Sequence, residues 1–136
     1  MSKSKKLFCV MIALAAVSWV VPLRADDPAN KIVSQVWMNL DTSTTISSLT
    51  SDPRYPDSPD TTSLLDSWLF PPGSTGGSNW ADNYGDREFG WLKPPETGDY
   101  TFWIAGDDLC ELWLSTDSST TNAQLIAQVD GWTNAL

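Results

Sequence analysis

Hydrophobic and polar positions alternate with a period of two along several short stretches of the chain. The stretches that show it are residues 32–40, 87–93, 100–105, 110–115 and 123–129. Such alternation is typical of half-buried β-strands. The 3.6-residue period of an amphipathic helix does not recur, although a short helical turn fits residues 64–69. The pattern therefore predicts an all-β domain.

Turn and loop residues separate these stretches. Residues 41–63 are rich in Ser, Thr, Pro and Asp and are expected to form a long irregular loop, and residues 71–77 another. Pro94 and Pro95 end one predicted strand because proline donates no ladder hydrogen bond. Short strands with turn signals about every 8–12 residues are typical of a sandwich or barrel. We therefore expect an antiparallel β-sandwich.

The N-terminal segment differs from the rest of the chain. A basic head with three lysines precedes an apolar run from Leu7 to Val21, and Pro22 and the small residue Ala25 follow. This order is typical of a secretory signal peptide. We expect residues 1–25 to be helical and to be removed, which gives a secreted or cell-surface protein. The alternative is an uncleaved anchor, although the run is shorter than the roughly 20 residues of a spanning helix.

Charge and composition exclude several classes of function. Removal of residues 1–25 leaves four basic and 17 acidic residues, a formal charge of 4 − 17 = −13. Such a surface repels phosphate and anionic lipid, so we expect neither nucleic acid nor a membrane as partner after cleavage. The absence of histidine removes Ser-His-Asp catalysis and most zinc sites. Cys110 is expected to be buried, because it shares a strand face with Leu112 and Leu114.

One long motif carries a family resemblance. The run from Arg87 to Asp108, REFGWLKPPETGDYTFWIAGDD, closely resembles the core of the PA-fourteen domain, which is named after the anthrax protective antigen. That module occurs in glycosidases, yeast adhesins and exported bacterial proteins. The resemblance extends over residues 32–133. It implies a jelly-roll-like β-sandwich over residues 32–136, which is expected to be incomplete at its C-terminal end.

The resemblance also implies a metal site at Asp107 and Asp108. In the adhesin members the matching Asp pair, joined by a cis peptide, binds calcium and presents it to sugar hydroxyls. The alternative is an acidic turn whose side chains accept hydrogen bonds from nearby backbone N–H groups. Trp103 and Trp132 are the candidates for stacking against a sugar ring. The alternative for Trp103 is packing in the core or between strands.

The leading prediction is an exported, non-catalytic carbohydrate-binding or adhesion module, with calcium as its cofactor. Its expected partner is a glycan or a cell-surface polysaccharide. Two alternatives stay open: a structural or interaction domain of a larger surface protein, and an accessory domain of a glycosidase. No pair of carboxylates in the sequence has a spacing that indicates glycosidase chemistry, so we expect no enzyme in this chain.

Overall fold

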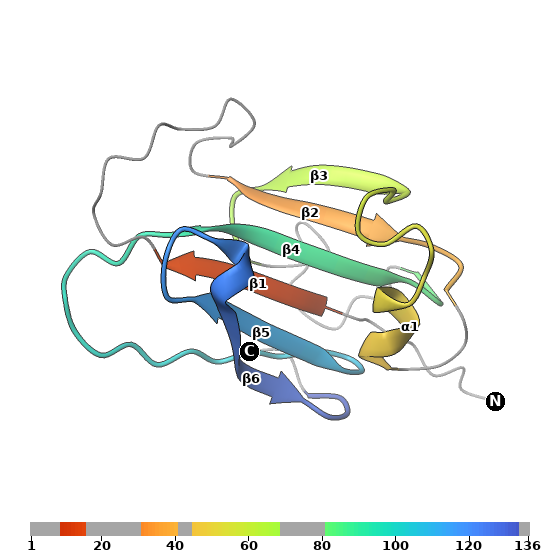
Figure 1. The fold of residues 1–136 in the computed structure, drawn as a ribbon. Coiled ribbons are helices and arrows are strands. Elements are labelled where there is room, and N and C mark those ends of the chain that lie inside the picture. Colours follow the sequence, from red (N-terminus) through yellow and green to blue (C-terminus); the bar gives the residue numbers. More distant parts are fainter. Residues whose placement is uncertain (1–8, 16–30, 41–44, 69–80, 134–136) are drawn as a thin grey trace.

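The computed structural model describes residues 9–15, 31–40, 45–68 and 81–133 (Figure 1). Its strands are β1 (Cys9–Ala15), β2 (Ile32–Trp37), β3 (Thr61–Leu65), β4 (Gly85–Leu92), β5 (Cys110–Ser115) and β6 (Ala123–Val129). The helical elements are α1 (Ile46–Thr50) and a single 3₁₀ turn, η1 (Thr120–Asn122). The prediction of an all-β domain is confirmed. Neither helical element of this part of the chain has the length and hydropathy to cross a membrane.

The strands lie side by side in one mixed sheet, in the order β3-β2-β4-β1-β5-β6 (Figure 1). Strand β2 pairs antiparallel with β3 and β4, and β5 pairs antiparallel with β6. Strand β1 is parallel to both of its neighbours, β4 and β5. The expectation of a purely antiparallel sheet is therefore wrong at β1. Within the described ranges no second sheet accompanies the first, and the sandwich stays a prediction.

Strand β1 lies inside the segment for which we expected a helical signal peptide. Residues Cys9–Ala15 are extended and paired on both edges, so the helix is wrong over this stretch. The physical reason is that a continuous apolar run suits a central parallel strand as well as it suits a helix. The remaining residues of the expected signal peptide, 1–8 and 16–25, lie outside the described residues.

Two further stretches differ from the expectation. Residues 100–105 form no strand, although the alternation along them predicts one with Tyr100 on its apolar face, and Tyr100 is 47% exposed. Residues 64–69 contain no helical turn where the chain is described; strand β3 runs to Leu65 instead. The expected loop over residues 41–63 contains helix α1 and the start of β3. The other four predicted strands are present, and β5 and β6 have the predicted bounds.

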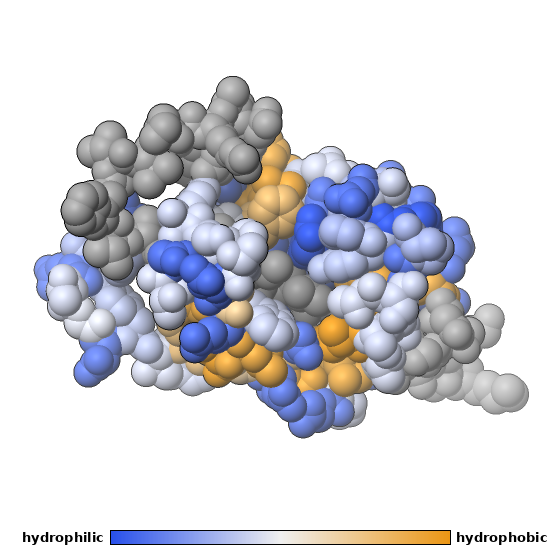
Figure 2. Space-filling model, in the orientation of Figure 1, coloured by the Kyte–Doolittle hydropathy of each residue, from blue (hydrophilic) through white to orange (hydrophobic). Residues whose placement is uncertain are grey.

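The core of the described residues lies where α1 covers one end of the sheet. Its buried cluster consists of Trp37 at the end of β2, Leu40 shortly after that strand, and Leu49 of α1. Tyr55 and Trp113 pack at the border of this cluster. Along β6, Leu125 and Ile126 are exposed, and Figure 2 shows apolar patches along the edge of the sheet where β5 and β6 lie. The largest buried cluster therefore lies at the α1 end of the sheet, while Ile32, Leu65 and Leu112 are buried elsewhere along it.

Arg54 fixes the loop between α1 and β3 to the end of β2. Its guanidinium donates to both carboxylate oxygens of Asp52 (2.9 and 2.8 Å), to Asp60 Oδ2 (2.8 Å) and to the carbonyl oxygen of Met38 (2.9 Å). This bidentate geometry holds a planar guanidinium in one orientation. The loop consequently presents Tyr55 against Trp37, with ring centroids 5.1 Å apart.

Arg87 of β4 ties this loop to the sheet. It donates two hydrogen bonds to Gln35 Oε1 of β2, at 3.1 and 2.5 Å. Its guanidinium also lies over the rings of Trp37, Tyr55 and Phe89, at 5.9, 5.4 and 5.0 Å from their centroids. A cation over aromatic faces is attracted by their quadrupoles. Arg87 thus helps to hold Tyr55 in place.

Candidate functional site

Asp107 and Asp108 form a bend that leads into β5. Gly106 precedes them and Leu109 follows, and both aspartates are half-buried. The peptide bond between Asp107 and Asp108 is cis, the same form as in the adhesin members that the resemblance brings in. The structure therefore places the two predicted metal ligands at a strand entry, partly open to solvent.

Hydrogen bonds join this bend to the chain that follows β6. The backbone N–H of Gly106 donates to Thr133 Oγ1 at 3.0 Å, and the N–H of Thr133 donates to the carbonyl oxygen of Gly106 at 2.8 Å. Because Trp132 directly precedes Thr133, these bonds bring Trp132 to the bend. The structure thus brings the backbone at Trp132 beside the bend of Asp107 and Asp108, from a separate part of the chain.

The two predicted tryptophans lie on the surface. Trp103 is 72% exposed and Trp132 is 67% exposed, the largest fractions among the exposed apolar side chains of the described ranges. Neither side chain is buried in a core. An exposed indole presents a flat apolar face to a ligand. Trp103 precedes the bend in sequence, on the stretch that leads to Gly106.

As a calcium site the bend supplies only part of a ligand set. In the described portion of the chain, no three acidic, cysteine or histidine side chains gather as a metal centre would require. Calcium takes 6–8 oxygen ligands. Asp107 and Asp108 would therefore supply carboxylate oxygens, and waters, backbone carbonyls or ligand hydroxyls would supply the rest.

Gly106→Ala is expected to destabilise the bend. A Cβ at this position would lie 2.7 Å from Sγ and 3.1 Å from Cβ of the buried Cys110, so either the bend or β5 must shift. Overpacking of this kind costs about 1–3 kcal/mol, which urea unfolding would measure. The matched control is Gly98→Ala, where an added Cβ meets nothing within 4 Å. Equal stability of the two variants would contradict this close packing.

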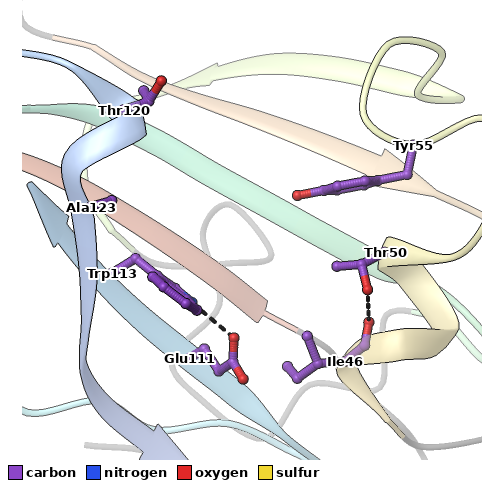
Figure 3. A pocket seen from close by; sticks show the side chains of 7 residues that line it. All are labelled: Ile46, Thr50, Tyr55, Glu111, Trp113, Thr120 and Ala123. Atoms are coloured by element: carbon purple, nitrogen blue, oxygen red, sulfur yellow. Dashed lines mark hydrogen bonds between the residues drawn. The ribbon is translucent and has the colours of Figure 1, made fainter.

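A pocket of about 470 Å³ opens between α1 and strands β5 and β6 (Figure 3). In Figure 3, Ile46, Thr50 and Tyr55 lie on one side of it and Glu111 and Trp113 on the other. Its complete lining is Ile46, Thr50, Tyr55, Glu111, Trp113, Thr120 and Ala123. Aromatic faces, hydroxyls and one carboxylate together suit a neutral ligand rich in hydroxyl groups.

Glu111 and Trp113 hold each other in the pocket wall. Trp113 Nε1–H donates to Glu111 Oε2 at 2.8 Å (Figure 3). Their spacing of two on β5 puts both side chains on one face of the sheet, and that signal was available in the sequence. The alternation along residues 110–115 puts Glu111 on the outward face of the strand, which by itself indicates only a structural position. The opposite wall depends on Tyr55, whose position follows from tertiary contacts.

Burial shifts the pKa of two groups in the sheet, the Glu88 carboxyl and the Cys110 thiol. Burial raises the pKa of the Glu88 carboxyl to about 7. Burial also raises the pKa of the Cys110 thiol to about 11, with smaller contributions from the charges of Asp86 and Glu111. Cys110 is buried, as predicted. Its thiol is protonated at neutral pH and is a poor nucleophile in that form.

Comparison with known proteins gives one partial match. A stretch of 47 residues is 51% identical to part of N-acetyl-beta-glucosaminyl-glycoprotein 4-beta-N-acetylgalactosaminyltransferase 1 of Mus musculus. The stretch is 35% of this chain and 4% of the transferase, so the chain spans a small fraction of that protein. No protein-family model and no solved structure matches the chain.

Proposed function

We propose that this chain is an exported carbohydrate-binding or adhesion module of the PA-fourteen type, a β-sandwich over residues 32–136 preceded by a signal peptide, residues 1–25. The observation that carries the proposal is the exposed Trp132 held beside the bend of Asp107 and Asp108. An aromatic face packs against the C–H groups of a sugar, while nearby carboxylates accept hydrogen bonds from its hydroxyls. That combination supports a glycan or cell-surface polysaccharide as the ligand.

Calcium is part of the proposal. Asp107 and Asp108 would hold the ion, which when bound offers coordination positions to sugar hydroxyls. The formal charge of −13 for residues 26–136 favours the approach of cations. Gly106 and Thr133 fix the bend to the chain that carries Trp132, and Trp103 adds a second exposed ring.

The proposed role is non-catalytic. A glycosidase needs two carboxyl groups facing each other across the scissile bond, about 5 Å or more apart. Asp107 and Asp108 are instead consecutive residues of one bend, and Glu111 is engaged by Trp113. Neither the Asp107–Asp108 bend nor Glu111 offers two carboxyl groups that face each other across a gap. This supports glycan binding without hydrolysis.

Asp108→Asn is expected to weaken calcium-dependent glycan binding about tenfold or more, because an open site loses one of two carboxylates. Binding would be measured on a glycan array in calcium and in a chelator, and the best ligand then titrated by calorimetry. The matched control, Asp99→Asn, changes an exposed carboxylate outside the bend and should bind as the unaltered chain does.

Trp132→Ala separates stacking from metal binding. It should weaken glycan binding while calcium uptake, titrated without glycan, stays unchanged. Glycan binding that survives the chelator and the Asp108→Asn change would contradict the calcium-assisted form of the proposal. A folded chain that binds no glycan in either condition would favour a structural or interaction domain instead.

A further inference from the structure

Strand β1 is the only described link in the hydrogen-bonded sheet between two groups of strands. Strand β4 pairs with β1 along one edge and with β2 along the other. Strand β5 pairs with β1 along one edge and with β6 along the other. Without β1 the sheet would divide into β3-β2-β4 and β5-β6. An open strand edge readily pairs with another strand, and a two-stranded pair is only marginally stable in water. The edges of β4 and β5 therefore flank a slot one strand wide (Figure 1).

The segment in this slot has the composition that the slot requires. Residues Cys9–Ala15 read CVMIALA and carry no charge. They pair in parallel with Asp86–Leu92 on one side, and Cys9–Leu14 pair with Cys110–Ser115 on the other. Strands in the interior of a parallel arrangement are typically continuous apolar runs. The uncharged, continuous apolar run that makes this segment similar to a signal peptide therefore also suits it to the position between β4 and β5.

The register also places the two cysteines of the chain opposite each other. Cys9 is the Cα partner of Cys110 across β1 and β5, and the sequence contains 2 cysteines. Neighbouring strands lie about 4.8 Å apart, within the Cα separations of about 4.4–6.8 Å found in disulfides. The chain therefore contains a natural reporter of this register.

We propose that the slot between β4 and β5 is a strand-binding site, and that its occupant is the chain's own segment Cys9–Ala15. The segment is held by pairing on both edges and does not need its connection to β2. A cut between residues 15 and 31, such as signal cleavage after Ala25, therefore leaves the segment bound as a separate peptide. This is β-strand addition, in which main-chain hydrogen bonds supply affinity and alternate side chains supply specificity. The inference is independent of glycan binding.

The first test cuts the folded full chain. A specific protease site replaces residues 22–25, the purified chain is cut after folding, and the fragments are followed by native size exclusion and mass spectrometry. The two fragments should elute together, with the amides of β4 and β5 still protected from hydrogen exchange. Ile12→Pro removes a ladder donor in the middle of β1 and should speed release of the short fragment about tenfold or more. The control Ser18→Pro lies outside β1 and should leave the complex intact.

The second test uses the two cysteines in the uncut chain. Because Cys110 is buried in the folded chain, oxidised glutathione is added while the chain refolds from urea. Oxidised glutathione accepts two electrons and is reduced to two thiols, while the thiols of Cys9 and Cys110 lose their protons and form one disulfide. Trypsin should then yield residues 7–24 linked to residues 88–136 from a monomer. Links between two copies of the same cysteine would overturn the proposed register. Release of the short fragment after cutting, with β4 and β5 still protected, would overturn the strand-binding site.

Discussion

Trp37→Ala is expected to lower the free energy of unfolding by about 3–5 kcal/mol, the range for removal of a large buried aromatic side chain. Trp37 is 0% exposed and packs with Leu40 and Leu49 in the buried cluster. Its ring also contacts Tyr55 and lies under the guanidinium of Arg87. The substitution removes all of these contacts and leaves a cavity where α1, β2 and the Tyr55 loop meet. Most small domains have only about 5–15 kcal/mol of stability, so this loss is large.

Trp37→Phe is the matched control for this prediction. The indole Nε1 of Trp37 is buried and has no hydrogen-bond partner among the described residues. Phenylalanine removes this unpaired N–H while it keeps an aromatic ring against Tyr55 and Arg87. An unpaired buried donor costs about 1–3 kcal/mol, which offsets part of the lost packing. Urea unfolding should therefore show a clearly smaller loss than for alanine, and equal losses would argue against a packing role for the ring.

The same substitution should affect the pocket. Tyr55 forms one of its walls and rests on Trp37. With alanine at position 37, Tyr55 keeps its cation–π contact with Arg87 but loses the ring below it. The wall opposite Trp113 should then become mobile. Stability of the core and shape of the pocket are thus connected through one contact between two rings.

The alternation of apolar and polar residues was sufficient to predict strands in which the apolar residues are the buried ones. Strand β5 is the clearest case: Cys110 and Leu112 are buried at the positions that the period of two predicts. Residues 100–105 alternate equally well, yet they have no partner strand in the described structure. Pairing depends on what lies alongside a segment, which the segment's own pattern does not contain. Strand β3 was missed for the converse reason, since most of its residues are exposed and its sequence, TTSLL, shows no apolar face.

The candidate site was predictable in its residue types and less so in its assembly. Asp107, Asp108, Trp103 and Trp132 were chosen from the sequence, and the structure places both tryptophans at the surface. The proximity of Trp132 to the bend rests on hydrogen bonds between Gly106 and Thr133. Residues so far apart in sequence come into contact only because β5 and β6 pair, and the sequence pattern of either strand does not specify its partner. The pairing of β1 is of the same kind, because its apolar run is compatible with a helix and with a strand.

We expect the free energy of unfolding of the unaltered chain to fall as pH rises. Glu88→Gln should abolish most of that fall. Glu88 lies on β4, is 1% exposed, and its Oε1 has no hydrogen-bond partner among the described residues. Ser34, its register partner on β2, is also buried. Burial without compensation disfavours the charged carboxylate. This is why the pKa of Glu88 rises to about 7, from its ordinary value of 4.5.

The sign of the effect follows from comparing the two states. Below about pH 4.5 the carboxyl is protonated in the folded and in the unfolded chain, and its burial carries no charge penalty. Between pH 4.5 and about 7 the unfolded chain releases the proton and the folded chain keeps it, so stability falls as pH rises. Above about pH 7 both states are ionised and the loss is complete. A shift of this size corresponds to roughly 3 kcal/mol.

Urea unfolding of the full chain between about pH 4.5 and pH 8 measures this loss, which Glu88→Gln should largely abolish. The control Glu96→Gln alters an exposed glutamate and should keep the pH dependence. A chain whose stability does not fall over this range would contradict the raised pKa. Glu88 is also the register partner of Met11 in β1. Ionisation of Glu88 therefore places an unpaired charge beside the slot, and the cut N-terminal segment should be released faster at pH 8 than at pH 5.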